Sequence, residues 1–274
     1  MKTHFGWAVA STLLMASMGA AQAADMSMPM KAPPPAVPAP TWTGCYLDAG
    51  IGYSVWNNDQ TLTGPFGGGG TLATAATTRA GGNGWLGRIG GGCDWQLSGE
   101  LSRWVIGGFA DYDLVSARGS FTPNEVFNVG GGFQPVSANV KQNGTGYVGA
   151  RVGYIALPGL LTYVNAGWTG TRFSQGGEFA TAFGAPIGFN YPGWTNNNGW
   201  FVGGGTEYAL PWFNGLFLRS EYRYASYGNR NLAEVNTTTG VLTGNVQSVK
   251  TIDQTATTSL VWKFNWGSPV VAKY

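Results

Sequence analysis

Apolar and polar residues alternate one by one along eight stretches of the chain. In the first stretch every second residue is apolar, namely Leu47, Ala49, Ile51, Tyr53 and Val55. An alternation with a period of two residues is the signature of a β-strand with one apolar face. The same alternation recurs over residues 85–95, 104–114, 147–154, 163–169, 200–208, 216–224 and 257–264. We therefore predict eight strands, each long enough to cross a bilayer, which takes about 9–11 tilted residues.

The connections between these strands alternate in length. Tight turns are expected at 97–101, 157–160 and 210–214. The remaining connections are expected to be long loops rich in Gly, Thr and Asn, over 57–83, 116–140, 174–198 and 229–248. Long loops at one end and tight turns at the other are typical of transmembrane β-barrels. Because unpaired backbone groups are costly in lipid, the sheet should close. The predicted fold is all-β, an eight-stranded antiparallel up-and-down transmembrane β-barrel.

A soluble exported barrel or sandwich would show the same alternation, and the composition separates the two. Of the 274 residues 43% are hydrophobic but only 10% are charged, whereas a soluble domain carries about 25% charged residues. The less apolar face is mostly Gly, Ser and Thr with isolated charges, which suits a narrow lumen. We therefore expect the apolar face to look outward into lipid.

The N-terminus is expected to direct export. Lys2 is followed by an apolar run over 7–16 and by the small-x-small site Ala21-Gln22-Ala23, a pattern typical of a secretory signal peptide. A transmembrane helix is the alternative, but the run is shorter than the ~20 residues a bilayer requires. We predict a signal peptide at 1–23, a proline-rich periplasmic spacer at 24–40, the barrel at 41–266 and a C-terminal tail at 267–274.

The mature chain offers little catalytic chemistry. The only histidine, His4, lies in the predicted signal peptide, and the four glycines at 67–70 are not followed by Gly-Lys-Ser/Thr as in a phosphate loop. We expect neither an enzyme nor a cofactor or metal site. The net charge of +2 without a basic run argues against nucleic-acid binding.

Charged residues of both signs alternate with the apolar residues, so they fall on the strand positions whose side chains point inward, which we call the inward parity. Eight strands enclose an interior just wide enough for side chains, so we expect a network of ion pairs that plugs the lumen, with a narrow ion path as the alternative. Glu207 and Arg219 flank one tight turn and are expected to pair across neighbouring strands. The predicted lumenal residues are Asp48, Arg88, Asp94, Asp111, Asp113, Arg151, Glu207, Arg219, Glu221, Arg223 and Lys263.

Two cysteines and a set of aromatic residues fall on the other strand positions, whose side chains point outward (the outward parity). Cys45 and Cys93 lie on adjacent strands near the tight-turn end, so a disulfide in the oxidising periplasm and two separate lipid-facing thiols are both open. Aromatic residues on this parity are expected to face the membrane, where Trp and Tyr favour the interfaces. They are Tyr53, Trp85, Trp95, Trp104, Tyr112, Trp168, Trp200, Tyr208, Tyr222, Trp262 and Phe264.

Four short segments carry a resemblance to a known family. They are WTGCY at 42–46, GARVGY at 149–154, EYRY at 221–224 and FNWG at 264–267. In this order they resemble the small outer-membrane barrels of alphaproteobacteria, of the rhizobial and Brucella surface-antigen type, which are similar in architecture to the OmpA transmembrane domain. Cys45 departs from the pattern, since that family usually has an aromatic residue there. Either Phe264 or Tyr274 could serve as the assembly signal.

The resemblance implies a Gram-negative outer membrane and a structural role in envelope integrity and surface presentation. Its implied partners are outer-membrane lipid and lipopolysaccharide, with the barrel-assembly machinery during biogenesis. A small porin-like channel of low permeability and a surface adhesion or ligand-binding barrel remain the alternatives. The long loops are expected to be hydrophilic caps, because no loop offers histidine or clustered aromatics with basic residues.

Overall fold

The computed structural model describes residues 41–63, 71–73, 77–121, 125–129, 132–180 and 185–264. The predicted signal peptide, spacer and C-terminal tail lie outside these residues. Among the described residues, no helix is long and apolar enough to cross a membrane.

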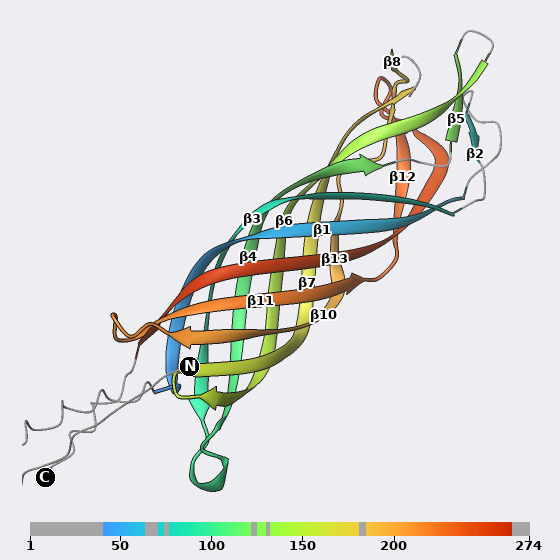
Figure 1. Ribbon diagram of the computed structural model, residues 1–274. Coiled ribbons are helices and arrows are strands. Elements are labelled where there is room, and N and C mark those ends of the chain that lie inside the picture. Colours follow the sequence, from blue (N-terminus) through green and yellow to red (C-terminus); the bar gives the residue numbers. More distant parts are fainter. Residues whose placement is uncertain are drawn as a thin grey trace, which may run out of the picture. The chain divides into compact units, whose positions relative to one another are not determined.

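Eight long antiparallel strands form a closed ring (Figure 1). Each pairs with its neighbours in the chain, and the first and last of them pair from Cys45–Phe264 to Thr63–Val246, which closes the barrel. The predicted eight-stranded antiparallel barrel is therefore confirmed. The ring strands are β1 (Gly44–Thr63), β3 (Thr77–Gln96), β4 (Trp104–Phe121), β6 (Gly132–Leu157), β7 (Leu160–Ala180), β10 (Thr195–Ala209), β11 (Leu216–Tyr227) and β13 (Leu242–Phe264).

The two ends of the barrel differ. At one end lie the three tight connections, one of which contains the 3-10 turn η1 (Gly99–Leu101). In outer-membrane barrels the short turns face the periplasm and the long connections face the outside. Figure 1 shows short strands at the other end. These are β2 (Thr71–Ala73), β5 (Glu125–Val129), β8 (Ala185–Pro186), β9 (Phe189–Asn190) and β12 (Arg230–Asn236).

The prediction that 57–83, 116–140, 174–198 and 229–248 are loops is wrong for much of their length. Strand β1 continues to Thr63 and β3 already begins at Thr77. Strand β6 is 26 residues long and β13 is 23, about twice what a bilayer requires. The barrel wall therefore extends well beyond the membrane on the outer side.

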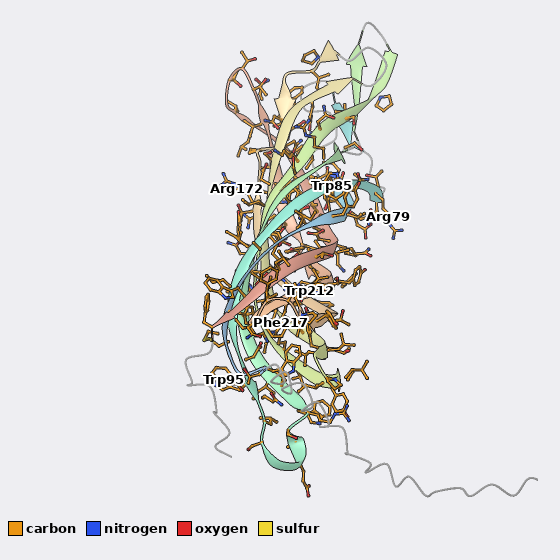
Figure 2. The ribbon with its side chains drawn as sticks, turned by 60° about the vertical axis from the view of Figure 1, so that its left-hand side comes forward. Arg79, Trp85, Trp95, Arg172, Trp212 and Phe217 are labelled. Carbon is orange, nitrogen blue, oxygen red and sulfur yellow. A yellow bond between two sulfur atoms is a disulfide. The ribbon has the colours of Figure 1, made fainter. Side chains whose placement is uncertain are left out.

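Two rows of outward aromatic residues mark the height of the membrane. On β3, Trp95 lies near the tight-turn end and Trp85 lies ten residues further along the strand; both are exposed. At about 3.3 Å per residue and a tilt of about 40° this separation corresponds to about 25 Å, the height of the apolar band of such barrels. Trp200 and Tyr208 repeat the arrangement on β10. Figure 2 shows Trp85 and Trp95 at separate heights.

Above the outer aromatic row the polarity of the wall reverses. On β1, Ile51 and Tyr53 face outward and are exposed, whereas Trp56 and Leu62 face inward and are fully buried. On β1 the outward positions in this upper part are polar, namely Asn57, Asp59 and Thr61. The upper interior holds an apolar cluster of Trp56, Leu62, Leu86, Val115, Ala117, Ala138, Val140, Phe173, Tyr191, Trp194, Leu232 and Val249.

Candidate functional site: the charged lumen

All eleven predicted lumenal charges point into the barrel in the structure. None exposes more than 6% of its surface. Their six carboxylates and five cations come from seven of the eight ring strands, and each has at least one oppositely charged partner. They form two clusters, a lower cluster of Asp48, Asp94, Arg151, Glu207, Arg219 and Lys263 and a central cluster of Arg88, Asp111, Asp113, Glu221 and Arg223.

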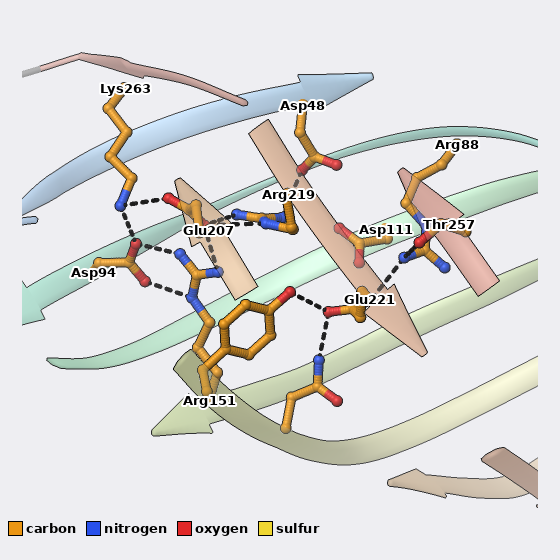
Figure 3. Close-up of polar contacts among 12 residues, drawn as sticks. Asp48, Arg88, Asp94, Asp111, Arg151, Glu207, Arg219, Glu221, Thr257 and Lys263 are labelled. Atoms are coloured by element: carbon orange, nitrogen blue, oxygen red, sulfur yellow. Dashed lines mark hydrogen bonds and ion pairs between the residues drawn. The ribbon is translucent and has the colours of Figure 1, made fainter. Parts of the chain in front are cut away.

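Glu207 of β10 lies at the centre of the lower cluster (Figure 3). Its carboxylate accepts hydrogen bonds from Arg219 at 3.0 and 3.1 Å and from Arg151 at 3.0 Å. Lys263 lies 2.9 Å from its second oxygen. Glu207 and Arg219 are direct cross-strand neighbours on β10 and β11. They pair as expected from their positions on either side of one tight turn.

Asp94 and Asp48 complete the lower cluster. Arg151 donates to Asp94 through two nitrogens, one of them Nε at 2.8 Å. Lys263 donates to the same carboxylate at 3.0 Å, and Arg219 reaches Asp48 at 3.3 Å. Three cations therefore share three carboxylates drawn from β1, β3 and β10. Because a buried charge is costly unless it is paired, this balance keeps the ionised groups stable inside the barrel.

The central cluster is built around Arg88 and Glu221. Arg88 forms a bidentate salt bridge with Asp113, with hydrogen bonds of 2.7 and 2.8 Å, and donates a further hydrogen bond to Glu221 at 2.7 Å. The second oxygen of Glu221 accepts from the Tyr163 hydroxyl at 2.8 Å and from Asn165 at 2.7 Å. Arg223 pairs with Asp111 across the lumen, and the three ring strands β3, β4 and β11 supply all five charges.

Aromatic rings fill the space around these charges. The guanidinium carbons of Arg219 and Arg151 lie 4.6 and 4.9 Å from the centre of the Tyr46 ring. That of Arg223 lies 4.7 Å from the Tyr147 ring, which is 1% exposed. A cation over an aromatic face gains electrostatic attraction that strengthens when water is excluded. These tyrosines were not among the predicted lumenal residues, although Tyr46 shares the inward parity of Asp48 and Tyr147 that of Arg151.

A third polar layer lies above the central cluster and was missed by the sequence analysis. The carboxylate of Asp253 accepts hydrogen bonds from Gln142 at 2.6 Å and from Ser54 at 2.9 Å. Gln142 also donates to Thr145 and Thr171 at 3.1 and 3.2 Å. Asp253 lies on the inward parity of β13, four residues before Thr257, where the predicted strand begins. A strand predicted to begin earlier would have included it.

Glycines leave the room that the carboxylates occupy. A methyl group built on Gly107 would collide with the carboxylate of Asp94, and one on Gly90 would collide with that of Asp111. The outward glycine next in sequence, Gly108, has only one neighbouring atom at 3.9 Å. The inward glycines are therefore part of the site.

The outward groups also lie where their parity places them. Cys45 and Cys93 are direct neighbours on β1 and β3, and their sulfur atoms are bonded. Ten of the eleven predicted membrane-facing aromatics are exposed; Phe264 is half-buried and lies 4.5 Å, ring centre to ring centre, from Trp262. The outer loops were expected to offer no clustered aromatics with basic residues, but aromatic rings do gather in the interior at this end. Phe173 and Trp194 stack there at 4.9 Å, and Trp56 meets Phe173 edge-on at 5.4 Å.

This arrangement is suited to closing the barrel. Side chains that line an open channel are accessible to water, whereas these charges are almost entirely inaccessible. Within the described residues, no group of three or more His, Cys, Asp or Glu side chains has the geometry to hold a metal ion.

Comparison with known proteins agrees with this fold. No family model matches the chain. It is 28% identical over 249 residues to the 31 kDa outer-membrane immunogenic proteins of Brucella melitensis and Brucella suis, covering 82% of this chain and 90% of each relative. Its fold is similar to the crystal structure of the outer membrane protein OprG from Pseudomonas aeruginosa. That match has a TM-score of 0.50 and 10% identity and covers 83% of this chain and 99% of OprG.

The relatives and the closed barrel together place the chain in the outer membrane. Its apolar, aromatic-rimmed band and its lack of outward charge within that band are the physical counterpart of this location. The chain is an outer-membrane β-barrel protein similar to alphaproteobacterial surface antigens.

Proposed function

We propose that this outer-membrane barrel is a closed, structural component of the cell envelope that supports envelope integrity and presents its extended outer end at the surface. The observation that supports this proposal most directly is the lumen, in which eleven charged side chains are paired and none is more than 6% exposed. Buried ion pairs tie strands that are distant in sequence, such as β1 and β11 through Asp48 and Arg219.

The proposed role is not catalytic. Each carboxylate of the lower cluster is engaged by Arg or Lys, and a carboxylate held in this way is poorly suited to exchange protons with a substrate. The low exposure of these groups, at most 6% for any of them, also supports a role that does not require a solute to reach them.

The porin alternative predicts a different electrical behaviour. We expect the purified full chain in planar lipid bilayers to show no stable single-channel steps, with a large general porin as the positive control for detection. Insertion is verified by recovering the heat-modifiable folded form from the same membranes. Regular, long-lived steps that scale with salt concentration would overturn the closed-lumen proposal in favour of the porin.

A further inference from the structure

Three basic residues lie together on the outer face of the barrel above the membrane. Arg118 of β4 and Lys141 of β6 are direct cross-strand neighbours. Lys141 is in turn opposite Ser174 of β7, and Arg172 lies two residues before Ser174 on the same face. Arg118 and Arg172 are exposed and Lys141 is half-buried. Figure 2 shows Arg172 projecting away from the wall. We refer to Arg118, Lys141 and Arg172 as the basic patch.

Among the described residues, no carboxylate pairs with the basic patch. None of its three residues forms a salt bridge within the described part of the chain, whereas Arg79 elsewhere on the outer face pairs with Asp59 at 2.8 Å. Like charges directly opposite one another on adjacent strands repel. The opposed pair of Arg118 and Lys141 therefore lowers stability unless an anion from outside the chain lies between them.

The height of the patch identifies the compartment from which that anion comes. Arg172 lies four residues beyond Trp168, a member of the outer aromatic row. At about 3.3 Å per residue and a tilt of about 40°, this places Arg172 roughly 10 Å above the row. That is the level of the headgroups, and long basic side chains extend toward the interface.

A polar groove next to the patch adds neutral hydrogen-bonding groups. It has a volume of about 590 Å³, and its lining includes Tyr112, Asn143, Arg172, Ser174 and Thr195. Phe173 and Trp194 also border it, but their rings are buried in the upper interior, so the groove offers mainly its polar side chains to sugar and phosphate oxygens. Directly below lies the lipid-facing ring of Trp168.

We propose that the basic patch and this groove bind the phosphorylated disaccharide headgroup of lipid A in the outer leaflet. Arg recognises phosphate through paired N–H donors and Lys acts as a point charge, and the aromatic row beneath contacts the first part of the acyl chains. This inference rests on the outer-membrane location and is independent of whether the lumen conducts.

The test is a titration of the refolded full chain in detergent micelles with diphosphoryl lipid A, in the presence of EDTA, followed by tryptophan fluorescence. A basic residue near an anionic headgroup contributes roughly 1 kcal/mol, or about a fivefold change in affinity. We expect K141Q/R172Q to weaken binding by about 25-fold, and adding R118Q to weaken it further. Lipid A with one phosphate removed should bind more weakly to the wild type.

The matched control removes two charges elsewhere on the outer face. Arg230 and Lys250 of β12 and β13 are exposed, and R230Q/K250Q should bind diphosphoryl lipid A as the wild type does. Every variant is first checked for heat-modifiable migration, and the single variants K141Q and R172Q serve if the double variant does not fold. Equal loss in both double variants, no loss in K141Q/R172Q, or displacement of lipid A by millimolar inorganic phosphate would each overturn the proposal.

Discussion

At the scale of single residues, Glu207 is the group on which the lower cluster most depends. It is fully buried and lies within 3.1 Å of charged nitrogens from three cations, Arg151, Arg219 and Lys263. No other carboxylate in the lumen contacts as many cations. Without its charge, three buried cations would be left with Asp94 and Asp48 alone.

We expect E207Q to lower the free energy of unfolding by about 3–5 kcal/mol, the cost of leaving buried charge unpaired. The exchange keeps the shape of the side chain and removes only its charge. Urea unfolding in lipid vesicles, followed by tryptophan fluorescence, measures the effect. The control is E100Q in the exposed turn η1, which should change stability by less than about 0.5 kcal/mol. Equal stability of both variants would show that the lumenal pairs contribute little.

The substitutions G107A and G108A each add one methyl group and so test how closely the lumen is packed. The methyl of G107A would collide with the carboxylate of Asp94 and, less closely, with the backbone of Cys93, whereas the methyl of G108A faces open space on the lipid side. Overpacking costs about 1–3 kcal/mol. We therefore expect G107A to be destabilised by that amount in the same urea assay and G108A to be unaffected. If both variants unfold at the same urea concentration, the carboxylates are not confined as described.

At the scale of elements, the sheet shows what alternation alone can and cannot predict. The direction of Asp48 or Arg151 follows from local parity, because successive side chains of a strand point to opposite faces. Which charges meet depends on the closure of the ring and on pairs such as Arg88 with Glu221, 133 residues apart. Parity contains no information about such distant partners, so the two clusters could not be derived from it.

The lengths of the strands were missed for a physical reason. Within the membrane the apolar parity faces lipid, but above the outer aromatic row the apolar parity faces inward. On β4, Leu114 is exposed while Val115 and Ala117 are buried. A search for one continuous apolar face ends at this switch, and the polar outward residues beyond it resemble a loop. The switch itself marks the membrane boundary.

The disulfide between Cys45 and Cys93 ties β1 to β3 beside the seam where β1 also pairs with β13. It closes a segment with a sequence separation of 48 residues, and such a link typically contributes about 2–4 kcal/mol. We expect C45A/C93A to lose that much stability, and dithiothreitol to have the same effect on the wild type but none on the variant. Mass spectrometry without reductant should find the wild type two hydrogens lighter than its reduced form. Free thiols on both residues would contradict the bond.

At the scale of the whole barrel, two interiors of different chemistry are stacked along one wall. The interior at membrane height is held by ion pairs and aromatic rings. The interior above it contains an apolar cluster like that of a soluble protein, together with buried polar side chains such as those of Gln60 and Gln247. The outer row of aromatics and the basic patch lie where one interior gives way to the other. Because the two parts are stabilised by different forces, they should be separable by mutation.

We expect F173A to loosen the outer part and leave the membrane part intact. Phe173 is 1% exposed and contacts both Trp56 and Trp194, and truncating such a ring costs about 3–5 kcal/mol. Amide hydrogen exchange should therefore rise by about 100-fold or more in the upper part of β7 and β10, while residues 160–168 stay protected and migration stays heat-modifiable. The control is F213A in the exposed periplasmic turn, which should change neither region. If F173A raised exchange equally in both parts, the wall would unfold as one cooperative unit, and the outer cluster would be inseparable from the barrel in the membrane.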